Sequence, residues 1–73
     1  MEYEKQLKYK DKSPQVRSAV ADQGYGLDIL INDKAPRVRS AVANQGYGLD
    51  VLACDKSGTV RKAVKDYHKY GKY

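Results

Sequence analysis

The sequence predicts an all-α protein, a short α-solenoid built from repeats of about 22 residues. Residues 13–34 and 35–56 align without gaps, and 16 of the 22 positions are identical. The same pattern begins again after residue 57, at Val60, Arg61, Ala63 and Val64. A fixed period of this length is typical of stacked repeats, in which each unit buries an apolar face against the next.

The repeat divides a single helical-repeat domain, residues 1–73, into four units. Residues 1–12 match only part of the repeat and are predicted to form an N-terminal cap. Residues 13–34 and 35–56 are the two complete repeats, and residues 57–73 are predicted to form a basic C-terminal capping helix. Polar end units are expected because the outer face of a terminal repeat has no neighbour.

Each complete repeat predicts one helix with a single buried face. Apolar residues at i, i+3 and i+4 form the stripe in both repeats: Val16, Ala19, Val20, Val38, Ala41 and Val42. Pro14 and Pro36 suit the first helical position, where no backbone N–H is needed. Gly24 and Gly46 stand where each helix should end, and we expect them to take the left-handed conformation that closes the last turn.

A shorter helical element is predicted after each of these stops. Two pairs of leucines three residues apart mark it: Leu27 with Leu30, and Leu49 with Leu52. This spacing suits a short helix or 3₁₀ turn whose leucines face inward. The third unit has no glycine at the stop position, so the helix that begins near Gly58 is predicted to continue toward Tyr70.

Composition and charge place the chain in a reducing setting and give it a basic C-terminal end. Cys54 is the single cysteine, so no internal disulfide forms, and no apolar leader opens the chain. We therefore expect a cytoplasmic protein. No apolar run approaches the ~20 residues that a membrane span needs. Residues 57–73 carry five Lys and Arg against one Asp, or +4 of the net charge of +5.

An aspartate lies six residues before an arginine in all three units: Asp11 and Arg17, Asp33 and Arg39, Asp55 and Arg61. We interpret the pairs as a structural ladder in which each loop aspartate accepts hydrogen bonds from an arginine of its own or an adjacent repeat. The alternative is a stripe of guanidinium groups offered to phosphate or carboxylate. The matched aspartates favour the ladder, because a partner-binding stripe has no need of a carboxylate at every step.

The pattern Asp-x4-Val-Arg-x-Ala-Val-Ala, a glycine-bounded turn and Leu-Asp-x-Leu together cover residues 11–66. The pattern resembles HEAT-type repeats and the leucine-rich repeat variant family. Resemblance to the latter implies α-helices that alternate with 3₁₀ helices in a right-handed superhelix, with units of about 24 residues. The present unit is shorter, and Gln-Gly-Tyr-Gly replaces the Asn-Pro turn common in that family. An iron–sulfur cluster found in that family needs more cysteines than Cys54.

Tyr25 and Tyr47 each stand between two glycines and are expected to project from the same edge of successive repeats. Tyrosines in this setting usually pack the ring on the stack and leave the hydroxyl in water. Exposed side by side, they would instead anchor a partner. With Arg37, they are the candidate partner-binding residues of the two repeats. The Gly-x-Gly sequence lacks the strand and the Gly-Lys-Ser/Thr that a phosphate-binding loop requires.

Basic and aromatic side chains interleave in the C-terminal helix. Lys62, Lys65 and Lys69 fall on one face at helical spacing, and Tyr67 and Tyr70 lie among them. The simplest interpretation is a capping helix whose lysines keep the end of the stack soluble. The same five residues are candidates for binding nucleic acid through phosphate contacts and base stacking, or for contacting an acidic protein.

No feature of the chain predicts catalysis, a metal site or a cofactor. The chain has one histidine and one cysteine, and its carboxylates do not cluster in an apolar setting. Cys54 and His68 would be the only conceivable nucleophile and base, and an isolated pair of this kind is usually coincidence. We therefore expect a protein that is not an enzyme, with no catalytic residue and no cofactor.

The function expected from the sequence is that of a non-enzymatic module that binds another protein. The first alternative is a nucleic-acid-binding protein that uses the basic, tyrosine-rich C-terminal helix. A further alternative, suggested by the small size and the charged ends, is a small inhibitor of bacterial or phage mobile-element type that docks on a host nucleic-acid enzyme. Self-association through the open ends of the stack also stays open, whereas a membrane is not an expected partner.

Overall fold

Every regular element in the described part of the chain is helical. The computed structural model describes residues 8–70, so the start of the expected N-terminal cap (1–7) and the last residues of the C-terminal unit (71–73) lie outside it. The elements are η1 (Lys8–Lys10), α2 (Pro14–Asp22), α3 (Leu27–Leu30), α4 (Pro36–Asn44), α5 (Leu49–Leu52) and α6 (Gly58–Tyr70).

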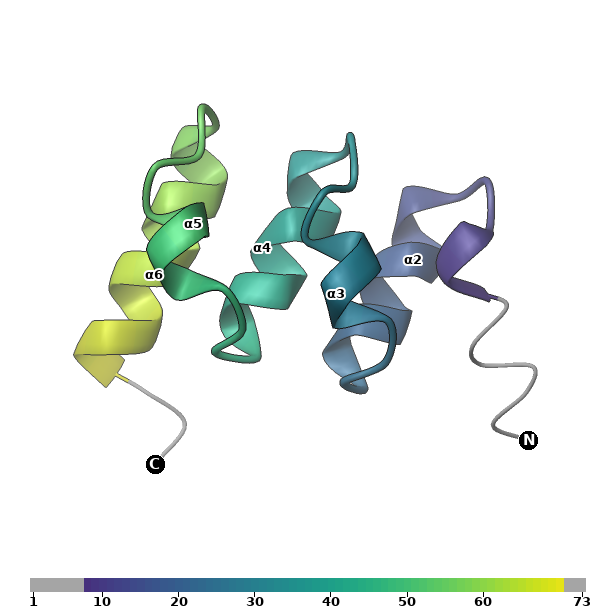
Figure 1. Ribbon diagram of the computed structural model, residues 1–73, viewed down its shortest axis with the longest axis horizontal. Helices are drawn as coiled ribbons and strands as arrows, with labels where there is room; N and C mark the ends of the chain where they lie inside the picture. Colours follow the sequence, from purple (N-terminus) through teal and green to yellow (C-terminus); the bar gives the residue numbers. More distant parts are fainter. Residues whose placement is uncertain (1–7, 71–73) are drawn as a thin grey trace.

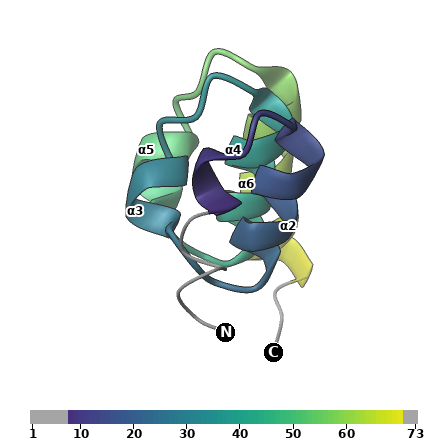
Figure 2. The same ribbon diagram turned by 90° about the vertical axis from the view of Figure 1, so that its right-hand side faces the viewer.

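The three longer helices α2, α4 and α6 lie side by side in chain order, with α4 in the middle (Figure 1). The short helices α3 and α5 lie on one side of this row. Seen along the row, they form a second layer beside the longer helices (Figure 2). Each short helix packs against the two long helices that flank it in the chain. The described residues thus form a two-layered helical body.

The core lies between the two layers. Leu30 and Leu52, the last residues of α3 and α5, are fully buried. The long helices add the rest of the core: Val20, Ala21, Val38, Ala41, Val42, Ala43, Val60, Ala63 and Val64. Val38 and Val42 of the middle helix are also completely covered, whereas Val16 of α2 is only half-buried and Ala19 is exposed. The apolar stripe is therefore fully covered only in the helices that follow another long helix.

Glycines with left-handed backbone geometry follow α2 and α4. The φ angles of Gly24 and Gly46 are +84° and +79°, in a region that side chains with a Cβ avoid. In α6 the position equivalent to Gly46 is His68, and the helix runs for 13 residues to Tyr70, as the sequence predicts. The glycines thus turn the chain from the long layer to the short one, and α6 makes no such turn within the described residues.

Candidate functional site

Two buried arginine–aspartate pairs each join a long helix to the loop that precedes the next long helix. Nε of Arg17 donates to Oδ2 of Asp33 at 2.7 Å, and its Nη2 donates to Oδ1 at 3.1 Å. Arg39 makes the same two bonds to Asp55, at 2.8 and 3.0 Å. In both pairs the aspartate lies sixteen residues after the arginine, in the loop before the next long helix. Each guanidinium therefore holds a carboxylate with two parallel hydrogen bonds, the strongest arrangement available to this pair of side chains.

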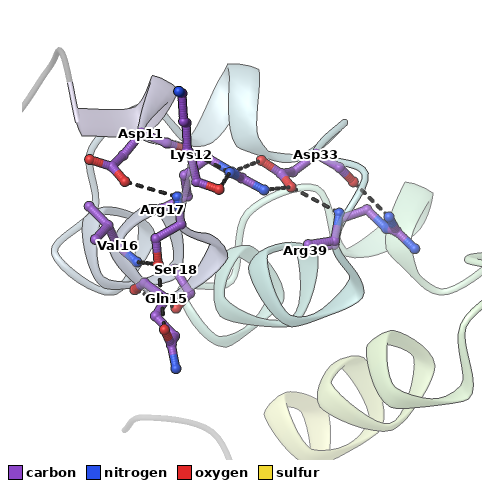
Figure 3. A network of polar contacts seen from close by, with 10 residues as sticks. Asp11, Lys12, Gln15, Val16, Arg17, Ser18, Asp33 and Arg39 are labelled. Carbon is purple, nitrogen blue, oxygen red and sulfur yellow. Dashed lines mark hydrogen bonds and ion pairs between the residues drawn. The ribbon is translucent and has the colours of Figure 1, made fainter.

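The remaining nitrogen of each guanidinium binds the loop before its own helix. Nη1 of Arg17 donates to the carbonyl oxygens of Asp11 and Lys12, at 2.7 and 3.0 Å. Nη1 of Arg39 donates to the carbonyl oxygen of Asp33 at 2.6 Å. Figure 3 shows this alternation from Asp11 through Arg17 and Asp33 to Arg39. The aspartate six residues before each arginine thus accepts from that arginine through its backbone carbonyl oxygen. Its carboxylate accepts from the arginine sixteen residues earlier, wherever the chain has an arginine at that position.

The same carboxylates also organise the starts of the long helices. One oxygen of each aspartate accepts the backbone N–H two residues later, in the pairs Asp11 with Ser13, Asp33 with Ala35, and Asp55 with Ser57. Ala35 offers no side-chain cap to α4, so the bond from Asp33 fixes the turn that a serine would otherwise help to hold. Because Arg17 and Arg39 are buried and engaged in this network, they offer no free guanidinium edge to a partner.

The network changes the acidity of its members. Burial by itself raises the pKa of the Asp33 carboxyl, but hydrogen bonds from Arg17 and the Ala35 N–H, together with the Arg17 charge, leave that pKa below its ordinary value. The hydrogen bond from Arg39 lowers the pKa of Asp55 against the opposing effect of burial. Hydrogen bonds to the two aspartates in turn raise the pKa of both guanidinium groups. Both pairs are therefore fully ionised at neutral pH.

We expect the melting temperature to be nearly constant from pH 7 to about pH 5 and to fall below about pH 4. A carboxyl group whose pKa is lowered by folding contributes stability that is present above the pKa of the unfolded chain and is lost as the pH falls through the folded pKa. Circular dichroism melts between pH 7 and pH 2.5 measure this. The Asp55→Asn variant should lose less stability between pH 5 and pH 3 than the unsubstituted protein, and an equal loss would contradict the assignment.

Arg61 occupies the position of Arg17 and Arg39 in α6 but has a different environment. Its Nη1 donates to the carbonyl oxygen of Asp55 at 2.6 Å, as in the other two units. Its side chain is exposed, and no carboxylate within residues 8–70 engages its Nε or Nη2. Three exposed lysines, Lys62, Lys65 and Lys69, line a hollow of about 440 Å³ together with Arg61. We call these four residues the α6 basic face.

The predicted aromatic residues differ in exposure. Tyr25 is half-buried and packs against the core, while Tyr47 is 39% exposed. Tyr67 is half-buried, and its ring and hydroxyl lie directly over Gly46. Tyr70 is 73% exposed, with Nζ of Lys69 at 5.3 Å from its ring centroid. Tyr47 and Tyr70 are therefore the most accessible of the tyrosines proposed for contacts, and the equally proposed Arg37 is exposed on α4.

An exposed apolar row lies on the short-helix layer and was not expected from the sequence. Ile29 of α3 is 47% exposed and Val51 of α5 is 59% exposed. The two residues occupy the same position of the repeat, 22 residues apart. The signal was present in Leu-Asp-x-Leu: when both leucines face the core, the residue between the aspartate and the second leucine is left outside. Because the residue at x is apolar in both repeats, each short helix exposes an apolar side chain at the same position.

The described surface also carries the single cysteine of the sequence. Cys54 is an exposed free thiol, and no three potential metal-ligating side chains come together within residues 8–70. None of the helices in that range is long and apolar enough to cross a membrane. No protein-family model, no curated protein and no solved structure matches the chain. The chain's own geometry must therefore carry the functional proposal.

Proposed function

We propose that the chain is a short right-handed α-solenoid of 22-residue repeats and that it acts as a non-enzymatic protein-binding module. The recurrence of a long helix followed by a short one supports the repeat architecture. The two arginine–aspartate pairs support it as well, because both join residues sixteen apart with the same atoms. The handedness rests on the resemblance to the leucine-rich repeat variant family.

The apolar row of Ile29 and Val51 is the observation that carries the protein-binding proposal. Single exposed apolar residues are common on protein surfaces, but here two stand at equivalent positions of successive short helices. Figure 2 shows the two helices on the same side of the molecule. Asp28 and Asp50 precede the row residues and are exposed. These carboxylates disfavour nucleic acid on this layer, because a phosphate backbone carries charge of the same sign.

A capture and binding experiment tests this role. A partner retained from nuclease-treated extract of the source cells is identified by mass spectrometry, purified, and titrated against the chain by calorimetry. We expect the Ile29→Ser/Val51→Ser variant to bind at least about tenfold more weakly, because truncated apolar anchors cost more than 1 kcal/mol each at binding hot spots. Equal affinity would contradict the assignment. The Asn32→Ser/Cys54→Ser variant, altered at another exposed pair of equivalent positions, is the matched control.

A nucleic-acid-binding function is the second candidate, and the α6 basic face favours it. Four cationic side chains surround one hollow, and the exposed ring of Tyr70 lies beside Lys69. Binding of this kind weakens steeply and uniformly with added salt. A contact anchored on aromatic and apolar side chains depends less on salt and weakens when Tyr47 is replaced by alanine. Titrations at two salt concentrations therefore separate the two functions.

The proposal places the module in the cytoplasm. The free thiol of Cys54 lies on the surface, and an exposed thiol of this kind is kept reduced in a reducing compartment. The fold is stabilised by two ion pairs and a small apolar core, with no disulfide among residues 8–70, and this agrees with a cytoplasmic location.

A further inference from the structure

We infer that Arg61 is a binding site for a carboxylate of an acidic protein segment, and that the bound carboxylate takes the geometry of the two buried pairs. This inference rests on the proposed protein-binding function and names the chemistry of the partner. It uses the α6 basic face, whereas the apolar row belongs to α3 and α5.

The guanidinium of Arg61 is held as the other two are held. Its Nη1 bonds to the carbonyl oxygen six residues earlier at 2.6 Å, and the corresponding distances are 2.7 Å for Arg17 and 2.6 Å for Arg39. The backbone N–H of all three arginines also donates to the carbonyl oxygen four residues earlier. In Arg17 and Arg39, this arrangement directs Nε and Nη2 at a carboxylate.

The same two donors of Arg61 are unoccupied within residues 8–70. Since the side chain is already fixed through Nη1, a carboxylate that binds there orders little more than itself. Preorganisation of this kind favours binding because it reduces the entropy lost on association. A planar ligand with two oxygens fits the fork formed by the Nε and Nη2 donors of Arg61. A lysine in place of Arg61 would not offer that geometry.

The residues around Arg61 argue against another repeat of this chain as the occupant. Lys65 stands where α2 and α4 have the fully buried Ala21 and Ala43. Lys62 stands where α2 has the buried Ser18. Long charged side chains at these positions prevent a further helix from packing as closely as α4 packs on α2. The occupant must instead satisfy several ammonium groups, and an acidic segment with more than one carboxylate does so.

The hollow also contains a carboxylate, which favours an acidic peptide over nucleic acid. Asp66 lines it and pairs with Nζ of Lys62 at 3.0 Å, and both side chains are substantially exposed. A duplex or single strand presents a phosphate at every nucleotide and meets Asp66 wherever it crosses the hollow. Successive side chains of an extended peptide point to opposite sides, so an acidic segment can place carboxylates at Arg61, Lys65 and Lys69 and turn the intervening ones away from Asp66.

Fluorescence anisotropy with two probes of equal charge tests the inference. One probe is a fluorescein-labelled, C-terminally amidated deca-aspartate peptide, and the other is a dT11 oligonucleotide with the same label, which has ten phosphates. Titrations at low salt keep the charge contacts measurable. We expect the unsubstituted protein to bind deca-aspartate more tightly than dT11. The Arg61→Lys variant should bind deca-aspartate about tenfold more weakly, because it keeps the charge but loses the fork.

Matched variants separate the fork from general charge and from folding. Lys12→Gln removes an exposed cation beside α2, at the other end of the row of helices, and should change the affinity less than about twofold. Lys65→Gln removes no hydrogen bond seen in the structure and should weaken binding about threefold through charge alone. Thermal melts of each variant verify that it is folded.

Three results would overturn the inference: tighter binding of dT11, unchanged binding by Arg61→Lys, or no binding of either probe. None of them bears on the apolar row, because the Ile29→Ser/Val51→Ser variant retains the α6 basic face and should bind deca-aspartate normally. Conversely, a natural partner that ignores the row substitutions contradicts the proposed apolar contact and leaves the Arg61 result unaffected.

Discussion

Replacing Arg39 with alanine is expected to lower the free energy of unfolding by about 3 kcal/mol, because it leaves the carboxylate of Asp55 buried without its cation. The Asp55 side chain is only 10% exposed, and it would keep a single hydrogen bond, from the Ser57 N–H. The substitution also frees the carbonyl oxygen of Asp33, which now accepts from Nη1. Urea denaturation followed by circular dichroism measures the effect as a lower midpoint with an unchanged slope.

The matched control is the same substitution at Arg61, the equivalent position of α6. Arg61 is exposed, and of the three side-chain hydrogen bonds that Arg39 makes it has only the equivalent of the one to a backbone carbonyl oxygen. Its replacement should therefore lower the free energy of unfolding by less than about 1 kcal/mol. Combining Arg39→Ala with Asp55→Ala should cost less than the sum of the two single changes, since the second removes the stranded charge. Equal midpoints for Arg39→Ala and Arg61→Ala would show that the buried pair contributes nothing particular to stability.

A loss of this size is large for such a chain. A core in a domain of this size rarely supplies more than ~3 to 5 kcal/mol of net stability, and the buried side chains here are mostly alanine and valine, with two leucines. The two ion pairs need not add much net stability. Once their charges are buried, however, both partners must be present, because a single buried charge strongly destabilises the fold. This is the physical reason to expect Arg39 to be far more sensitive than most positions.

The sequence predicts the members of this network but leaves their pairing open. Asp-x5-Arg occurs three times, and sequence spacing alone does not say whether the carboxylate meets the arginine six residues later or the one sixteen residues earlier. The choice depends on how closely neighbouring helices approach, a property of packing. The distinct environment of Arg61 is hidden for the same reason, because its motif is the same as that of Arg17 and Arg39.

The short helices illustrate a second limit of sequence reasoning. The leucine spacing predicts short helical elements, and α3 and α5 are found there. With four residues each, however, the elements are too short for periodicity to say which other side chains are covered. The exposure of Ile29 and Val51 depends on what packs across the layer, so only the three-dimensional arrangement reveals the apolar row.

The second large effect is expected for Gly46→Val, which should cost about 3 kcal/mol from two independent sources. The φ angle of Gly46 is +79°, and a β-branched residue is strongly disfavoured in that region. A Cβ at this position would also lie 2.5 Å from the hydroxyl oxygen of Tyr67 and 2.7 Å from its Cζ. The ring, which packs over the glycine, would have to move. Urea denaturation measures the total.

Gly24→Val separates the two sources, because Gly24 has the same backbone geometry without the crowding. Its φ is +84°, and the nearest atom to an added Cβ is Oε1 of Gln45 at 4.0 Å. Gln45, the residue after α4, stands 22 residues before Tyr67 and so at the equivalent position of the repeat, and the two variants differ mainly in the side chain that covers the glycine. We expect Gly24→Val to cost about 1 to 2 kcal/mol from backbone strain alone. Equal losses at Gly24 and Gly46 would mean that the Tyr67 ring moves aside freely, and a neutral result at both would refute the requirement for left-handed geometry at the helix ends.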